Sequence, residues 1–206
     1  MCGIAGILGK DAKSNVIDDM LMVQHHRGPD FTGKWLEEGV ALGHNRLSII
    51  DLSNSANQPF FDETKRYAIV FNGEIYNYIE LRKKLESSYN FRTTSDTEVL
   101  LAAFIFWGKD CLKYLNGMFS FAIYDSKSKS LFAARDRFGV KPFFYHKSND
   151  SFYFSSEIKA IHTTGIKKKP NEEIWASYFV YGSYGMPDET FWEEIYQLPG
   201  GHYLEL

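Results

Sequence analysis

The sequence predicts an α+β fold in which helices cover stacked antiparallel β-sheets. Segments with strand-like patterns gather toward both ends of residues 3–155, and helical segments with capping signals are grouped between them. Short polar stretches at 125–129 and 147–151 join neighbouring strand patterns in the way that hairpin turns do. Apolar residues make up 44% of the 206 residues and aromatic residues 17%, which is enough for a large buried core.

The first half of the chain begins with an apolar strand over 3–8 and a helix over about 15–24, with Ser14 as its expected cap. Val16, Met20 and Val23 recur at helical spacing, and Gly28-Pro29 ends the pattern. Short strands are then expected at 40–43, 46–50 and 67–71.

The second half has two helices and four more strands. Asn77 begins a capping-box-like sequence for a helix to about residue 86, and Ser95 begins a better one for the most apolar helix, which Gly108 ends. Strands are expected at 118–124, 130–135, 143–146 and 152–155.

The last forty or so residues differ in amino-acid composition from the rest of the chain. Lys167-Lys168-Lys169-Pro170 resembles a solvated linker, and residues 171–206 are aromatic, glycine-punctuated and too few to form their own core. We therefore expect one domain over residues 2–166. Residues 167–206 are expected to be a linker and packing strip that leads toward a further domain.

Composition and charge exclude several classes of function. A net charge of −3 gives no reason to expect nucleic acid or a membrane surface as a partner, and the apolar runs are too short to span a bilayer. With no signal segment at its start, the chain is expected to be cytoplasmic. Its two cysteines, Cys2 and Cys111, predict no disulfide, and Cys111 is expected to pack in the core. The six histidines have no ligand spacing, so no metal site is expected.

Cys2 is the first candidate for chemistry, because the chain begins Met1-Cys2-Gly3. If Met1 is removed, the thiol and a free α-amine lie on the same residue. An α-amine has a pKa of about 7.7–8.0, so a substantial fraction is neutral near pH 7.5 and can accept a proton. One residue could therefore supply both nucleophile and base. The alternative is that the chain begins Met-Cys by chance.

Three further segments carry groups that carboxamide hydrolysis would need. The side chain of Asn72 and the N–H of Gly73, after the strand at 67–71, could stabilise an oxyanion, although Asn-Gly is also a common hairpin signal. Arg46 could bind a carboxylate, or it could be a surface arginine on an edge strand. Asp96 could bind an ammonium group, or it could serve the N-terminus of its helix.

Several motifs occur together in a characteristic order: MCGIAGI, HRGPD, GHNRLSIID, FNGEIYN, SDTE, RDRFGVKPFFY, SSEIKAI and LPGGHYLEL. Together they resemble the glutamine amidotransferase domain of the asparagine synthetase family, over the whole chain from Cys2 onward. The resemblance implies the N-terminal nucleophile hydrolase fold. Related amidotransferases that make glucosamine phosphate or phosphoribosylamine share the opening cysteine, but RLSIID and FNGEIYN look like the asparagine type.

The resemblance also implies a role for each candidate residue. Cys2 matches the nucleophile, with its own α-amine as proton acceptor, and Asn72 and Gly73 match the oxyanion hole. Arg46 matches the group that binds the α-carboxylate of glutamine. Asp96, with the segment that includes Glu74, matches the group that binds the α-ammonium. Leu47, Ile49 and Ile50 match residues that line the same pocket. Arg27 matches the residue that orients the N-terminal cysteine.

The implied activity is hydrolysis of glutamine to glutamate and ammonia through a Cys2 thioester, for ATP-dependent transfer of the ammonia to aspartate in a full-length protein. No Ser-Gly-Gly-rich pyrophosphate loop is present, so ATP and Mg²⁺ are expected to bind a synthetase domain C-terminal to this chain, and no cofactor is expected within it. The expected partners are glutamine and that synthetase domain. A homodimer is considered as the assembly, with a second copy of the chain as the partner. Two alternatives remain open: a different acceptor such as a sugar, a peptide or another carboxylate, and a non-catalytic glutamine-binding regulatory domain.

Overall fold

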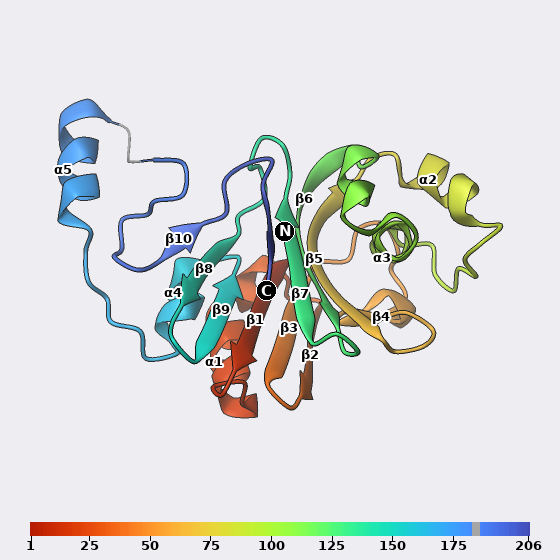
Figure 1. The fold of residues 1–206 in the computed structure, drawn as a ribbon, viewed down its shortest axis with the longest axis horizontal. Helices are drawn as coiled ribbons and strands as arrows, with labels where there is room; N and C mark the ends of the chain where they lie inside the picture. Colours follow the sequence, from red (N-terminus) through yellow and green to blue (C-terminus); the bar gives the residue numbers. More distant parts are fainter. Residues whose placement is uncertain (183–185) are drawn as a thin grey trace.

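The computed structural model describes residues 1–182 and 186–206, which form two stacked antiparallel sheets (Figure 1). Three residues of the strip predicted over 167–206, residues 183–185, lie outside this description. In the described residues the first sheet has the strand order β10-β8-β9-β1-β3-β2. The bounds of these strands, in chain order, are β1 Gly3–Gly9, β2 Phe31–Glu37, β3 Val40–Arg46, β8 Phe144–Lys147, β9 Ser151–Ser155 and β10 Tyr196–Gln197.

The second sheet has the order β11-β7-β6-β5-β4. Its strands are β4 Phe60–Phe61, β5 Tyr67–Ile75, β6 Gly117–Asp125, β7 Ser130–Arg135 and β11 Tyr203–Glu205. Neighbouring strands in both sheets pair antiparallel. Residues 196–206 thus supply an edge strand to each sheet.

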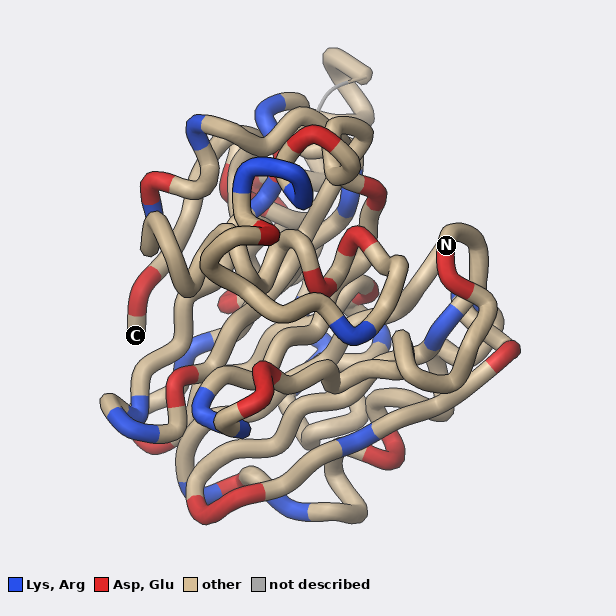
Figure 2. The backbone as a smooth tube through the Cα atoms, turned by 90° about the vertical axis from the view of Figure 1, so that its right-hand side faces the viewer, with Lys and Arg blue, Asp and Glu red and all other residues tan. Residues whose placement is uncertain are grey.

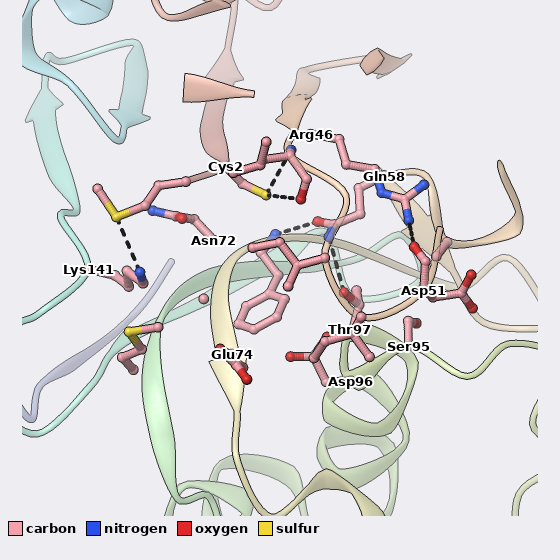
Figure 3. A pocket seen from close by; sticks show the side chains of 18 residues that line it. Cys2, Arg46, Asp51, Gln58, Asn72, Glu74, Ser95, Asp96, Thr97 and Lys141 are labelled. Atoms are coloured by element: carbon pink, nitrogen blue, oxygen red, sulfur yellow. Dashed lines mark hydrogen bonds between the residues drawn. The ribbon is translucent and has the colours of Figure 1, made fainter. Parts of the chain in front are cut away.

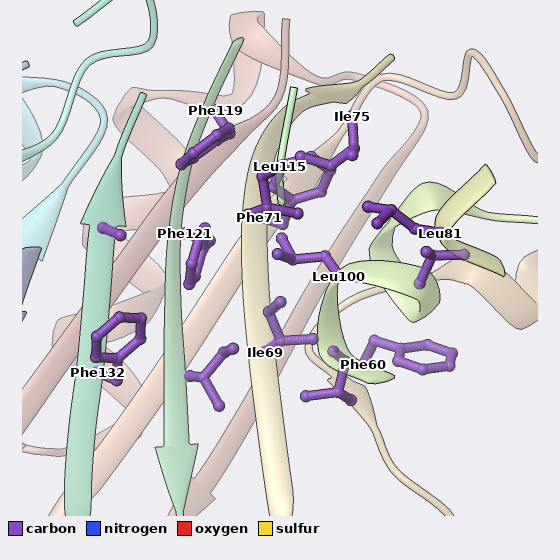
Figure 4. Packing of buried hydrophobic residues seen from close by; sticks show 14 residues of the cluster. Phe60, Ile69, Phe71, Ile75, Leu81, Leu100, Leu115, Phe119, Phe121 and Phe132 are labelled. Atoms are coloured by element: carbon purple, nitrogen blue, oxygen red, sulfur yellow. The ribbon is translucent and has the colours of Figure 1, made fainter. Parts of the chain in front are cut away.

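Alternating side chains along the central strands separate three apolar layers. On β1, Ile4 points into the space between the sheets, whereas Ala5 and Ile7 face α1 (Ser14–Val23) and α4 (Ile158–His162). On β5, Ala68 and Val70 face the first sheet. The opposite side of β5 packs on α2 (Tyr78–Leu85) and α3 (Asp96–Trp107), in the cluster drawn in Figure 4. The layer order is helix, sheet, sheet, helix, which confirms the predicted α+β architecture.

The remaining elements are short or lie at the periphery. Within residues 1–182 and 186–206, 3₁₀ helices occur at η1 His25–Arg27, η2 Asn54–Ala56 and η3 Gly108–Lys113. Helix α5 (Glu172–Tyr181) lies at one end of the molecule, away from both sheets (Figure 1). Basic and acidic positions are interspersed along the backbone seen from the side (Figure 2). None of the described helices is long and apolar enough to cross a membrane.

Several predicted boundaries were wrong. Ser14 is the first residue of α1 rather than its cap. Asn77 does lie at the N-cap position of α2, as predicted, but its side chain makes no cap bond. The segments 40–43 and 46–50 are not two strands: β3 runs from Val40 to Arg46 and residues 47–50 form a loop. The cap at Ser95 is confirmed, because its Oγ accepts a hydrogen bond from the N–H of Glu98 at 3.2 Å.

The largest correction concerns Asn72-Gly73-Glu74. These residues do not follow a strand but lie inside β5, which continues to Ile75 and pairs with β6 throughout. The hairpin alternative is therefore wrong. Cys111 is buried in η3, as expected, and burial raises the pKa of its thiol to about 12.

Candidate active site

A cavity of about 230 Å³ opens where the two sheets meet near the start of the chain (Figure 3). Pockets for drug-sized ligands measure about 300–1,000 Å³, so this one suits a smaller molecule such as an amino acid. Every site residue predicted above except Arg27 lines it. The full lining consists of Met1, Cys2, Arg46, Leu47, Ile49, Ile50, Asp51, Ala56, Gln58, Phe71, Asn72, Gly73, Glu74, Ser95, Asp96, Thr97, Met118 and Lys141.

Strand alternation explains why residues far apart in the sequence meet here. Cys2 continues the row that Ile4 begins, and Arg46 continues the row of Val40 and Leu42; both rows face the space between the sheets. Asn72 lies in the inward-facing row of Val70 on the other sheet. Three side chains of different chemistry are thus placed at one end of the space between the sheets.

The Cys2 thiol is partly buried and held by one residue. Its Sγ accepts a hydrogen bond from the N–H of Leu47 at 3.4 Å and lies 3.6 Å from the carbonyl of Leu47. Burial raises the pKa of the thiol above its usual value, and the bond from Leu47 and the charge of Arg46 oppose that effect. Because the thiol is held neutral, it needs a base in order to act as a nucleophile.

Arg27 lies outside the cavity but contacts the backbone of Cys2. Its Nε donates to the carbonyl of Cys2 at 2.9 Å, and its Nη1 donates to the carboxylate of Glu157 at 3.1 Å. A Cβ on Gly28 would lie 2.3 Å from the carbonyl of Asn45, so only glycine lets this turn approach the end of β3. Asp30 accepts a bond from the N–H of Ser48 at 2.7 Å. The HRGPD segment thus holds the backbone of Cys2, the end of β3 and the loop that follows it.

The amide of Asn72 is a buried donor with no hydrogen-bond partner among the described residues. A buried N–H₂ without an acceptor costs free energy, so its persistence calls for an explanation. The cavity supplies one, because an oxygen atom of a ligand could accept this bond.

The N–H of Gly73 points toward the same open edge of β5. The N–H of Phe71 donates to Gln58 Oε1 at 2.6 Å and that of Ile75 donates to Asp96 Oδ2 at 3.0 Å, and both acceptors lie beyond the edge away from β6. Since N–H groups alternate sides along a strand, the N–H of Gly73 faces that edge too. A Cβ here would lie 2.3 Å from the carbonyl of Met118, which explains the glycine.

Arg46 is buried at the end of an interior strand, so the edge-strand alternative is wrong. Its Nη1 donates to the carbonyl of Ser53 at 2.7 Å and to Asn57 Oδ1 at 2.6 Å, and its Nη2 donates to the carbonyl of Asp51. A guanidinium carries five N–H donors. These bonds fix its plane and, as far as the described residues go, leave the Nε–H and one Nη2–H for a ligand.

Acidic groups occupy another wall of the cavity. Asp96, in the first turn of α3, is buried, and burial raises the pKa of its carboxyl to about 6, with the nearby Glu74 acting in the same direction. A buried carboxylate without a cation is costly, and a bound ammonium group would compensate it. The cavity therefore has an anionic wall at Asp96 and Glu74 and a cationic one at Arg46, as Figure 3 shows.

The loop after β3 supplies the apolar wall. Leu47, Ile49 and Ile50 all line the cavity, and Ile49 is 68% exposed, which places it at the mouth.

Several lining residues were not predicted from the sequence. Gln58 braces the site by bonding the N–H of Phe71 and, through its Nε2, Thr97 Oγ1 at 3.1 Å. Asp51 and Lys141 belong to motifs quoted above, but no role followed from their spacing. Within the described residues, no group of three or more His, Cys, Asp or Glu could hold a metal ion.

The helix, sheet, sheet, helix arrangement is that of the N-terminal nucleophile hydrolase fold. A solved structure of glutamine phosphoribosylpyrophosphate amidotransferase from B. subtilis superposes with a TM-score of 0.71, at 21% sequence identity, over 100% of this chain and 49% of that one. The predicted fold class is confirmed.

The chain belongs to the family of glutamine amidotransferase domains, whose family model matches residues 1–206. It is 41% identical to "Asparagine synthetase [glutamine-hydrolyzing] 3" of Bacillus subtilis, over 99% of this chain and 34% of that protein. It is 36% identical to "Amidase chry2" of Gibberella zeae, over 99% of this chain and 32% of that protein. The chain thus spans about a third of the length of these curated relatives. It is an enzyme domain of the amidotransferase type, as predicted.

Proposed function

We propose that this domain hydrolyses the side-chain amide of glutamine to glutamate and ammonia, with Cys2 as the nucleophile. The observation that carries the proposal is the content of the cavity: a thiol, an unpartnered buried amide donor at Asn72, and acidic and basic walls for the two charged ends of an amino acid. Hydrolysis of a carboxamide needs the nucleophile and the oxyanion donor, and the charged walls suit the two charged ends of a free amino acid.

Glutamine is oriented by its charges. Its α-carboxylate bonds the two remaining N–H groups of Arg46, and its α-ammonium lies beside Asp96 and Glu74. Leu47, Ile49 and Ile50 cover the aliphatic part of the substrate. With both ends fixed, the side-chain amide is directed toward Cys2.

The reaction requires removal of Met1. Cys2 then becomes the N-terminal residue, and its neutral α-amine takes the thiol proton, through a water molecule. Sγ attacks the amide carbon, and the oxyanion that forms accepts hydrogen bonds from the side chain of Asn72 and the N–H of Gly73. Collapse of the intermediate transfers a proton to the leaving nitrogen and releases ammonia. Water then hydrolyses the thioester to glutamate. Arg27 keeps the Cys2 backbone in place through the bond to its carbonyl.

In a full-length protein we propose that the ammonia is transferred to aspartate activated by ATP and Mg²⁺ in a C-terminal synthetase domain, which would make the whole protein a cytoplasmic ligase. The names of the asparagine synthetase relatives and their greater length support this. Helix α5 also leaves Phe179, Val180 and Tyr181 at least 70% exposed, a surface that a further domain could cover. A homodimer remains a prediction.

A different acceptor is a second candidate for the whole protein. It is favoured by the likeness to Amidase chry2, which spans as much of this chain as the asparagine synthetase likeness does. The glutaminase chemistry of the present domain is the same in both cases. A non-catalytic regulatory role is less well supported, because Cys2, Asn72 and Gly73 are all present and line one cavity.

Release of glutamate from glutamine by the purified protein tests the proposal, with Cys2→Ala as the comparison and Cys111→Ser as the matched control. We expect release by the wild type and by Cys111→Ser and none by Cys2→Ala. Equal rates in wild type and Cys2→Ala would contradict the assignment.

A further inference from the structure

The loop 136–141 joins β7 to the segment before β8 and is held by hydrogen bonds to the side chains of two charged residues. The guanidinium of Arg135 donates to the carbonyls of Leu198, Gly139 and Lys141, at 2.6, 2.7 and 2.7 Å. From the other side, the buried carboxylate of Asp136 accepts bonds from backbone N–H groups at 2.9–3.1 Å, those of Phe119, Phe138, Val140 and Lys141.

The result of this bracing is that the side chain of Lys141 extends into the active-site cavity. Lys141 is 5% exposed and lines the cavity together with Cys2 (Figure 3). Its Nζ lies 3.3 Å from the Sδ of Met1, the one polar contact found for it within the described part of the chain.

A thioether is a weak acceptor and cannot compensate a buried ammonium as a carboxylate would. Burial, and then the charge of Arg27, lower the pKa of Lys141. The group therefore costs stability where it lies, and a costly buried charge in a functional cavity is typical of a group retained for activity. Once Met1 is removed, even this contact is lost, and the ammonium remains in the same cavity as the new N-terminal residue.

We propose that Lys141 supplies a fixed positive charge to the active site, which favours the thiolate of Cys2 and the neutral form of its α-amine. Both effects have the same origin, because a nearby cation stabilises an anion and disfavours a second cation. Lys141 thus prepares the nucleophile and its base together. This inference rests on the proposed role of Cys2 as the nucleophile.

The other charges around the cavity act differently on Cys2. Arg27 is paired with the carboxylate of Glu157. The charge of Arg46 also lowers the pKa of the Cys2 thiol, but in the proposed function Arg46 pairs with the α-carboxylate of glutamine, so Lys141 is the cation left to act on the thiolate when substrate is bound. Glu74 and Asp96 are negative and act against the thiolate, while the carboxylate of Asp136 is surrounded by backbone N–H groups. The ammonium of Lys141 has no acidic side chain bonded to it within the described residues.

The test is the pH dependence of Cys2 alkylation by iodoacetamide, which requires no glutamine. Cys111 does not interfere because it is fully buried and its pKa is raised to about 12. Lys141→Met keeps the length of the side chain and removes the charge. Lys84→Met, at an exposed position on α2, makes the same change in net charge away from the cavity. Intact mass first establishes that Met1 is absent from each preparation.

We expect the alkylation midpoint of Lys141→Met to rise by about 0.5–1 pH unit, which makes the reaction about three- to tenfold slower near neutral pH. The rising limb of the profile of kcat/KM for glutamine should move in the same direction. The melting temperature should not fall, since the substitution removes a poorly compensated buried charge. Lys84→Met should match the wild type in all three measurements.

An unchanged or lower alkylation midpoint in folded Lys141→Met would overturn the inference. So would a fall in melting temperature without a shift of the midpoint, because that result would assign Lys141 a structural role. If the midpoint shifts as expected but the wild-type protein releases no glutamate, the electrostatic role stands and the proposed glutaminase function fails.

Discussion

The buried carboxyl of Asp96 makes glutamine binding sensitive to pH. In the empty site its pKa is raised to about 6, first by burial and then by the charge of Glu74, and against the backbone N–H bonds that it accepts. Only the ionised form can pair with the α-ammonium of glutamine. Affinity should therefore decline as the pH falls through 6, although an ordinary aspartate would remain ionised to about pH 4.

The size of the effect follows from the fraction of Asp96 that is ionised. With a pKa of about 6, roughly nine-tenths of the carboxyl is ionised at pH 7 and roughly a tenth at pH 5. Glutamine should therefore bind about tenfold more weakly at pH 5 than at pH 7, since the competent form is populated less. Binding at pH 5 should also release a proton, because the ammonium group drives Asp96 to ionise.

Isothermal titration of glutamine into Cys2→Ala, which cannot turn the substrate over, measures both quantities. Asp96→Asn in the same background should bind at least tenfold more weakly at pH 7, and its affinity should not change between pH 5 and 7. The asparagine can still accept the bond from the N–H of Ile75, so the fold should be retained. Asp110→Asn, an exposed position outside the cavity, is the control. If Asp96→Asn keeps the pH dependence of the parent, the assignment of Asp96 is refuted.

Three further predictions concern Asn72, Gly73 and His44. Asn72→Ala removes one oxyanion donor and should lower kcat for glutamate release by about 10²–10³ with little change in KM; an unchanged kcat would contradict its role. Gly73→Ala places a Cβ 2.3 Å from the carbonyl of Met118 and should lower the melting temperature markedly, whereas a wild-type value would show that β5 and β6 can separate locally. The fully buried His44 has a pKa lowered to about 3, mainly by burial, so below pH 6.5 only the unfolded state takes up its proton. The free energy of unfolding should fall by up to about 1.4 kcal/mol per pH unit from 6.5 toward 3, and His44→Gln should flatten this slope in urea unfolding; an equal slope would assign the acid sensitivity to other groups.

The sequence predicted the elements whose signals are local. The apolar strand at β1 and the capped apolar helix α3 were recognised because each carries its own pattern and end signal. Strand β2 was missed because it is an edge strand with mostly exposed residues, so alternation of apolar side chains is weak.

The identity of the site residues could be read from the sequence, but their arrangement could not. Judged by local sequence alone, Asn72-Gly73 is a hairpin signal. It lies inside β5 because β6 pairs with this strand on one side, and on the other side Gln58 and Asp96 accept hydrogen bonds from backbone N–H groups of the strand. These acceptors come from positions up to 21 residues away in the chain, so no local pattern reports them. Lys141 was overlooked for the same reason: its place in the cavity depends on bonds that Arg135 and Asp136 make to a loop.

The most direct test of Cys2 as an N-terminal nucleophile is mass spectrometry of protein quenched in acid shortly after mixing with glutamine. The mass is measured on the intact protein and then on its peptides after digestion. We predict a chain that lacks Met1 and carries a γ-glutamyl thioester on the peptide that begins with Cys2, and no such adduct in Cys2→Ala. An adduct on the peptide that contains Cys111, or glutamate release by a protein that retains Met1, would contradict the mechanism.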